Sequence, residues 1–233
     1  MAGPHDSGLA VIVAETILYS TIAFLIISTN LLNIAVLSRN KILSIGGRCF
    51  MMSLAVADLG VGLLFGTALV GCVTRKALID SVFSVCFVLG ALNQIVYSAS
   101  TISLTLIAVD RYLAISRPIY YLNVVTKKKA MVVTLLAWIV LTLYAIVLGL
   151  IDGNFYRYNP NTYLCTPFYD RRQVVLVSLI TLWIIPFGLI IFTYTQILVF
   201  LRNRRRHVGN EVVRHDKRDN YLEDPESTES ENS

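Results

Sequence analysis

Three polar residues suited to binding a small cation, Asn30, Asp58 and Ser100, lie within long apolar segments of the sequence. At a rise of about 1.5 Å per helical residue, Asn30 lies roughly 10 Å, and the other two about 13 Å, from the same end of their segments. A carboxylate at this depth is costly unless it is protonated, paired or beside a cation. We therefore expect a sodium site, with charge from Asp58 and oxygen atoms or hydrogen bonds from the other two. A structural hydrogen-bond network between helices is the alternative, and the two interpretations are compatible.

A second group of polar residues forms a stripe along one helix. Asn93, Tyr97 and Ser100 are spaced by four and three residues, and Arg111 follows three helical turns later at nearly the same angle. The rest of the segment is apolar. This pattern predicts a helix at the centre of a bundle, with its stripe facing the interior.

Two cysteines are expected near the same face of the bundle. Cys86 lies about 35 Å from the far end of its segment, and Cys165 lies in the connection 152–173. A disulfide between them would tie this connection to the helix and contribute roughly 4 kcal/mol in the entropic treatment of cross-links. Cys72 is a rival partner, whereas Cys49 lies at the opposite face.

The sequence contains no arrangement typical of an enzyme. We find no nucleophile beside a base, no phosphate-binding loop and no metal-ligand spacing, and the three histidines lie outside the apolar segments. We therefore expect no enzymatic activity and no cofactor other than a sodium ion.

These residues are positioned by five apolar segments, 9–37, 49–73, 81–109, 130–151 and 174–201. Each exceeds the about 20 residues that a helix needs to cross a bilayer. The chain is 55% hydrophobic and 15% charged, whereas an average soluble domain has about 25% charged residues. The sequence predicts an all-α integral membrane protein with five transmembrane helices, and it excludes a soluble enzyme, a secreted disulfide-rich domain and a β-barrel.

The basic residues predict the orientation of these helices. The connections 38–48 and 110–129, together with the C-terminal segment, hold 15 of the 20 lysines and arginines. We expect them in the cytoplasm and the short N-terminus, 1–8, outside the cell. The net charge of +5 then reflects membrane topology and not nucleic-acid binding. The expected location is the cell membrane, as a multi-pass protein.

The C-terminal segment, 202–233, has no apolar run. It is basic over 202–218 and acidic over 219–233. This composition is typical of a disordered tail, expected here in the cytoplasm.

Several motifs resemble those of one family of membrane proteins. They are SLAVADL (53–59), DRYLAISRP (110–118), Trp138, Cys86 with Cys165, and Pro186 with Tyr194. In this order and spacing along residues 29–201, they resemble the rhodopsin-like (class A) G-protein-coupled receptors. The local sequence is similar to the part of the family that includes amine, melatonin and adenosine receptors.

The resemblance implies roles at the cytoplasmic face. In family receptors the arginine of the DRY motif contacts the G protein, which points to Arg111, with Asp110 as its ionic partner at rest. The other residues implied at this coupling face are Tyr112, Pro118 and Tyr194. Snorkelling of Arg111 and interfacial anchoring of Tyr194 are the plainer interpretations.

The resemblance also implies a ligand site among the outer ends of the helices, near Asn93, Tyr97, Ser178 and Thr181. Trp138 and Pro186 are implied as structural residues, with Pro186 kinking the fifth helix. Asn93 stands where amine receptors carry an aspartate. A neutral amide supplies no counter-charge, which argues against a biogenic amine as the ligand.

Family members continue into a sixth and a seventh helix, and no such apolar segment follows Arg206. We therefore expect a receptor truncated after its fifth helix. Its expected partners are the lipid bilayer, an extracellular ligand and a heterotrimeric G protein. The alternative is a non-signalling truncated receptor that associates with full-length receptor chains and regulates them, with retention inside the cell.

Overall fold

Five helices of the computed structural model are long and apolar enough to cross a membrane. The structure describes residues 4–39, 44–74, 83–151, 155–159, 162–169 and 171–223. The first four spans lie in α1 (Pro4–Arg39), α2 (Ile45–Thr74), α3 (Phe83–Ser116) and α5 (Lys127–Ile151). The fifth comprises α6 (Arg172–Leu179), a π-helical turn η1 (Ile180–Ile184) and the start of α7 (Ile185–Glu223). A short helix, α4 (Pro118–Val124), connects α3 to α5.

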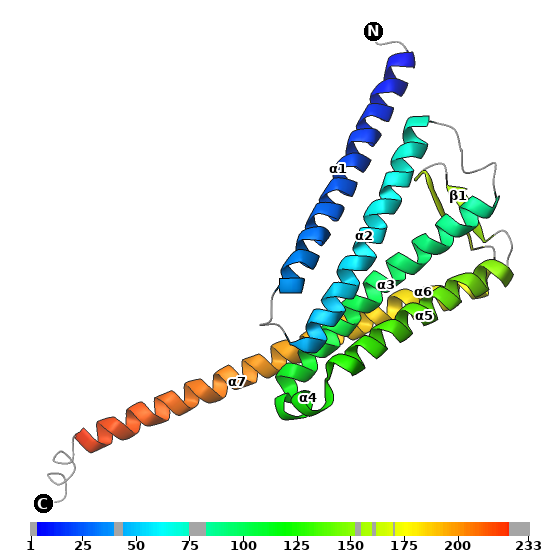
Figure 1. Ribbon diagram of the computed structural model, residues 1–233. Helices are drawn as coiled ribbons and strands as arrows, with labels where there is room; N and C mark the ends of the chain where they lie inside the picture. Colours follow the sequence, from blue (N-terminus) through cyan, green and yellow to red (C-terminus); the bar gives the residue numbers. More distant parts are fainter. Residues whose placement is uncertain are drawn as a thin grey trace, which may run out of the picture.

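The central element is α3, as its polar stripe predicts. It contacts α2, α4, α5, α7 and the outer strands, whereas α1 packs mainly on α2 (Figure 1). One core cluster joins Ala57, Ala99, Leu141 and Leu182 from α2, α3, α5 and η1. Small residues let helices approach closely, which is how membrane helices gain dispersion energy without a hydrophobic effect. Many large apolar side chains face outward, as lipid contact requires.

The outer connection contains a β-hairpin that the sequence analysis did not predict. Strand β1 (Tyr156–Asn159) pairs antiparallel with β2 (Leu164–Pro167). A disulfide joins Cys86 of α3 to Cys165 of β2, which confirms the expected pair over the rival. The five-helix fold therefore stands, with a two-stranded sheet added at one end of the bundle (Figure 1).

Pro186 shapes the fifth span. Proline has no N–H to donate to the carbonyl four residues earlier, and the π turn η1 lies immediately before it. Within this turn the N–H of Ile185 donates to the carbonyl of Ile180, five residues back. At Pro186, where a kink was expected, the helix contains a π-helical turn, which is wider than an α-helical one. The proline itself is fully buried.

The expectation of a disordered tail from residue 202 is wrong over 202–223, because α7 continues as one helix to Glu223 (Figure 1). This stretch has one glycine and no proline, and it is rich in arginine, which has a high helix propensity. The helix therefore continues although it has no apolar face. Likewise α1 already begins at Pro4, within the expected extracellular N-terminus 1–8. Residues 1–3 and 224–233 lie outside the described part.

Candidate functional site

A cavity of about 450 Å³ lies between α3, the hairpin and the fifth span. Asn93 and Tyr97 line it, as expected of a ligand site. The remaining lining residues are Gln94, Ser98 and Thr101 of α3, Thr162, Leu164, Thr166, Pro167 and Tyr169 of the outer connection, and Leu182 and Trp183 of η1. None of these described side chains is charged, and uncharged polar groups lie among a mainly apolar lining.

Asn93 is the most constrained polar residue of this cavity. Its Nδ2 atom donates to the carbonyl oxygen of Cys165 at 3.3 Å, so the amide is oriented by the disulfide-linked strand. Its Oδ1 atom is buried and accepts no hydrogen bond. A buried acceptor without a donor costs about 1–3 kcal/mol. Asn93 Oδ1 is therefore an oriented acceptor without a donor, on a residue that lines the cavity.

Two residues expected near the ligand lie elsewhere. Ser178 is buried in a hydrogen bond with the Tyr144 hydroxyl at 2.7 Å. Thr181 donates to the carbonyl of Val177 at 2.7 Å. Neither lines the cavity. The expectation for these two came from the family resemblance, which implied a ligand site among the outer ends of the helices, whereas helical phase decides which side chains point inward.

The expected polar core is partly assembled. The Ser100 hydroxyl donates to Asp58 Oδ1 at 2.7 Å, which links α3 to α2. Asn30 donates to its own helix, at the Ile26 carbonyl, at 2.9 Å. Asn30 and Asp58 nevertheless share a second cavity, of about 500 Å³, between α1 and α2. A carboxylate, a hydroxyl and an amide oxygen suit a hard cation. No group of three or more His, Cys, Asp or Glu suited to a metal occurs in the described ranges.

The DRY segment forms a compact site at the other end of α3. Asp110 is buried, and its Oδ1 atom accepts from the Tyr121 hydroxyl of α4 at 2.8 Å. The expected ionic contact with Arg111 is replaced by this bond, since Asp110 Oδ2 and Arg111 Nη2 both lack a hydrogen-bond partner. Burial raises the pKa of Tyr121, and the hydrogen bond to Asp110 adds to the increase while one to Ser44 opposes it.

The start of α2 packs directly on these two residues. A Cβ atom on Gly47 would lie 2.5 Å from Arg111 Nη2, and one on Gly46 would lie 2.7 Å from Asp110 Oδ1. Side chains are therefore excluded at both positions unless neighbours move. The sequence analysis missed this role of the glycines, and also that of Tyr121. The signal was present as two adjacent glycines at the beginning of an apolar helix.

The remaining residues implied at the coupling face are spread along three helices. Pro118 occupies the first turn of α4, where its missing N–H costs nothing. Tyr112 is half-buried on α3, and its carbonyl accepts from Ser116 at 2.7 Å. Tyr194 on α7 is 49% exposed.

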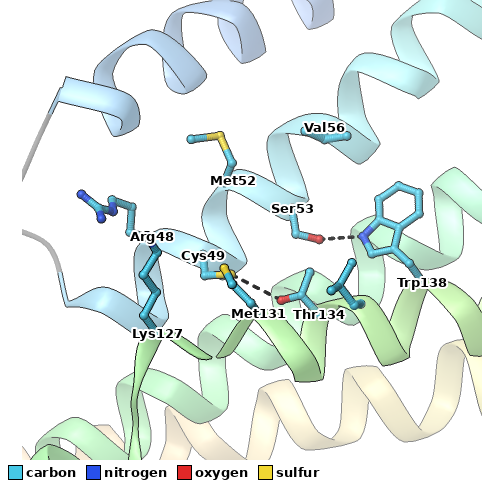
Figure 2. Close-up of a pocket in the computed structure, with 10 residues that line it drawn as sticks. Arg48, Cys49, Met52, Ser53, Val56, Lys127, Met131, Thr134 and Trp138 are labelled. Atoms are coloured by element: carbon cyan, nitrogen blue, oxygen red, sulfur yellow. Dashed lines mark hydrogen bonds between the residues drawn. The ribbon is translucent and has the colours of Figure 1, made fainter. Parts of the chain in front are cut away.

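Trp138, which was expected to be a structural residue, connects three helices through hydrogen bonds. Its Nε1 atom donates to Ser53 Oγ at 3.0 Å (Figure 2). Ser53 Oγ also shares a hydrogen bond with Ser103 Oγ at 3.0 Å. One indole thus joins α5, α2 and α3. Ser53 opens the SLAVADL motif, but no sequence pattern indicated Ser103 as its partner.

Comparison with known proteins agrees with this arrangement. The family profile described as 7 transmembrane receptor (rhodopsin family) matches residues 29–227. The chain is similar to melatonin receptor type 1A of Phodopus sungorus, at 30% identity over 88% of this chain and 57% of the relative. It is also similar to melatonin receptor type 1A of Mus musculus, at 31% identity over 82% of this chain and 56% of the relative. D(2) dopamine receptor A of Xenopus laevis is 29% identical over 82% of this chain and 42% of its own length.

The chain spans about half the length of these curated relatives. The match nevertheless covers most of the chain, including the central helix, the disulfide and the DRY segment. The chain belongs to the rhodopsin family of seven-transmembrane receptors, and it is not an enzyme.

Proposed function

We propose that this protein is a receptor for an uncharged extracellular small molecule, which binds in the cavity beside Asn93, and that it signals to a heterotrimeric G protein through Arg111. One observation carries the ligand class: the described residues that line the cavity include no charged side chain, and one of them, Asn93, has a buried acceptor, Oδ1, without a donor. A neutral ligand with an N–H or O–H group would satisfy this acceptor.

A cationic amine fits this cavity poorly. Moving a charge from water into a buried site without a counter-charge costs several kcal/mol. The relatives are named as receptors for melatonin and for dopamine. Melatonin is uncharged at neutral pH and dopamine is a cation. The chemistry of the cavity therefore favours a ligand of the melatonin type, an aromatic ring that carries an amide.

Arg111 is suited to the proposed coupling role because one of its donors is available. Its Nη2 atom is buried without a hydrogen bond, while Asp110 is held by Tyr121. An incoming backbone carbonyl would satisfy the guanidinium, and charge-assisted hydrogen bonds are the strong ones.

The proposed topology places the hairpin outside the cell and α4 in the cytoplasm. The disulfide between Cys86 and Cys165 lies at one end of the bundle, and disulfides persist on the oxidising side of the membrane. Most basic residues lie toward the other end, as the positive-inside rule requires. The proposed location is the plasma membrane.

A sodium ion beside Asp58 is part of the proposal. Asp58 Oδ1 accepts from Ser100 and faces the same cavity as Asn30. These residues would hold the ion by oxygen atoms, and the ion would supply the counter-charge that an ionised carboxylate needs at membrane depth.

The ligand proposal is tested with the full chain in lipid nanodiscs. We expect melatonin, and not dopamine, to raise its thermal stability. Asn93→Leu should weaken melatonin binding roughly tenfold, the value of one good hydrogen bond. Thr181→Ala is the matched control, because Thr181 does not line the cavity. Tighter binding of dopamine than of melatonin would contradict the proposed ligand class.

The coupling proposal needs its own measurement. Ligand-stimulated nucleotide exchange on a purified G protein should be lost in Arg111→Ala with ligand affinity retained. Exchange that is unchanged in this variant would contradict the role of Arg111.

A second function is favoured by one observation. Tyr97 lies on the polar stripe of α3 and keeps 37% of its surface exposed, although polar groups at membrane depth favour cover by protein. Association with other receptor chains would provide that cover. Under this alternative, co-expression would lower the surface level of a full-length receptor, and the chain alone would give no nucleotide exchange.

A further inference from the structure

The guanidinium of Arg111 lies against the first turn of α2, at the end of the bundle that contains α4. A Cβ atom on Gly47 would lie 2.5 Å from Arg111 Nη2 and 3.1 Å from Asp110 Oδ2. Ordinary contacts of a Cβ atom lie at 3.4–4 Å. The guanidinium therefore occupies space that exists only because residue 47 has no side chain.

The groups around Gly47 differ in how firmly they are held. Gly47 is buried, and its N–H donates to Ser44 Oγ at 3.3 Å, which is the arrangement of a helix N-cap. The Asp110 carboxylate accepts from Tyr121 at 2.8 Å. Arg111 Nη2, by contrast, makes no hydrogen bond and is the end of a long, flexible side chain. A methyl group at position 47 would therefore displace the guanidinium before it moved the helix or the carboxylate.

This position of Arg111 is unsuited to contact with another protein. The Nη2 atom is buried, so a carbonyl of a bound protein reaches it only after the guanidinium has moved away from α2. The position is also weakly held, because a buried donor without an acceptor is unfavourable. A small steric change at α2 is therefore enough to alter how often the guanidinium leaves it.

We propose that Gly47 is a positioning residue for G-protein coupling. By leaving space beside α2, it keeps the Arg111 guanidinium withdrawn, and it thereby keeps the activity of the unliganded receptor low. A larger residue at this position releases the guanidinium toward the G protein. The consequence for coupling rests on the proposed function of Arg111, whereas the withdrawn position of the guanidinium does not.

Chemical modification of arginine tests the position of the guanidinium without a G protein. The reagent p-hydroxyphenylglyoxal closes a ring across two guanidinium nitrogens, so burial of Nη2 slows the reaction. The full chain in lipid nanodiscs is treated, and the rate at Arg111 is measured by peptide mass spectrometry relative to Arg204, which is exposed on α7. In the wild type we expect Arg111 to react at least about tenfold more slowly than Arg204, because the reactive conformation is a minor one. Gly47→Ala should raise the rate at Arg111 roughly tenfold, the effect of moderate overpacking on an equilibrium.

Gly66→Ala is the matched control. It makes the same change on the same helix, and a Cβ atom on Gly66 would meet no atom within 4 Å. It should leave the rate at Arg111 unchanged. Nucleotide exchange on a purified G protein, without ligand, is the second readout. Exchange should rise several-fold in Gly47→Ala, stay at the wild-type level in Gly66→Ala, and be lost when Gly47→Ala is combined with Arg111→Ala.

Three results would overturn the proposal. The first is a wild-type Arg111 that reacts as fast as Arg204, a comparison that needs no variant to fold. The second is an equal rise in the rate at Arg111 in Gly66→Ala. The third is a faster reaction at Arg111 in Gly47→Ala with unchanged basal exchange, while ligand still stimulates exchange in the wild type. Absence of exchange in the wild type with and without ligand would instead refute the proposed function, and the modification rates would still show whether Gly47 keeps Arg111 withdrawn.

Discussion

Replacing Tyr121 with phenylalanine tests how the end of the bundle that contains α4 is held together. The Tyr121 hydroxyl donates to buried Asp110 at 2.8 Å, and the other oxygen of this carboxylate has no hydrogen bond. Tyr121→Phe keeps the ring and removes the donor. Hydrogen bonds to charged groups contribute about 1.5–3 kcal/mol, so we expect the free energy of unfolding to fall by that amount.

The measurement is equilibrium unfolding of the full chain in mixed micelles of a mild and a denaturing detergent. Tyr120→Phe is the matched control, because Tyr120 is the neighbouring residue of α4 and is 52% exposed. We expect it to change the free energy of unfolding by less than about 0.5 kcal/mol. A double-mutant cycle of Tyr121→Phe with Asp110→Ala should show coupling, because each single change removes the same contact.

The effect has a defined pH dependence. Burial raises the pKa of Tyr121 above its ordinary value of 10.0, so the folded state favours the protonated phenol. The protonated Tyr121 side chain therefore contributes fully to the free energy of unfolding below pH 10. This contribution is lost as the pH rises from 10 through the higher pKa of the folded state. The difference between wild type and Tyr121→Phe should be constant from pH 6 to 9 and should shrink above pH 10. A Tyr120→Phe variant that is destabilised as much as Tyr121→Phe would refute the reasoning.

Three further outcomes follow from contacts elsewhere in the bundle. Trp138→Phe should lower the free energy of unfolding by about 1–3 kcal/mol, because it leaves a packing defect and removes the donor to Ser53, measured by the same micelle titration. Tyr156→Phe should lower the free energy of unfolding by about 1 kcal/mol, because it removes the hydrogen bond from the Tyr156 hydroxyl to the Ala145 carbonyl. Since burial raises the pKa of Tyr156, this difference between wild type and variant should disappear in strongly alkaline solution. Asp58→Asn should abolish any stabilisation of the chain by sodium over potassium in thermal unfolding, and stabilisation that persists would exclude Asp58 as the sodium ligand.

The transmembrane part of the fold was predictable because the bilayer imposes a single rule. Every span needs about 20 apolar residues with its backbone bonded internally, so segment lengths alone located the five helices. Depth along those helices was predictable for the same reason. Counting residues from one end placed Ser100 level with Asp58, and the structure joins them at 2.7 Å.

Outside the bilayer the same reasoning fails. The hairpin depends on how the chain returns across the top of α3, and the position of Tyr121 depends on how α4 turns back beneath it, and neither leaves a periodic signal.

Helical phase is the second source of error. Ser178 lies at a suitable depth for a ligand but turns toward Tyr144 instead. The tail was misjudged because low hydropathy was taken as disorder, although its residues favour a helix.

The three groups of contacts on α3 suggest why the two proposed ends of this receptor act together. Its outer end is bonded covalently to the hairpin through Cys86, its middle to α2 through Ser100 and Ser103, and its inner end to α4 through Asp110. A helix fixed at three levels is unable to rotate at one end alone. The fifth span, by contrast, contains a π turn beside Pro186, and π turns are less regular than the helix around them. The ligand proposed to bond Asn93 would therefore act on a rigid helix with Arg111 at its far end, and the flexibility that a conformational change needs would lie in the fifth span.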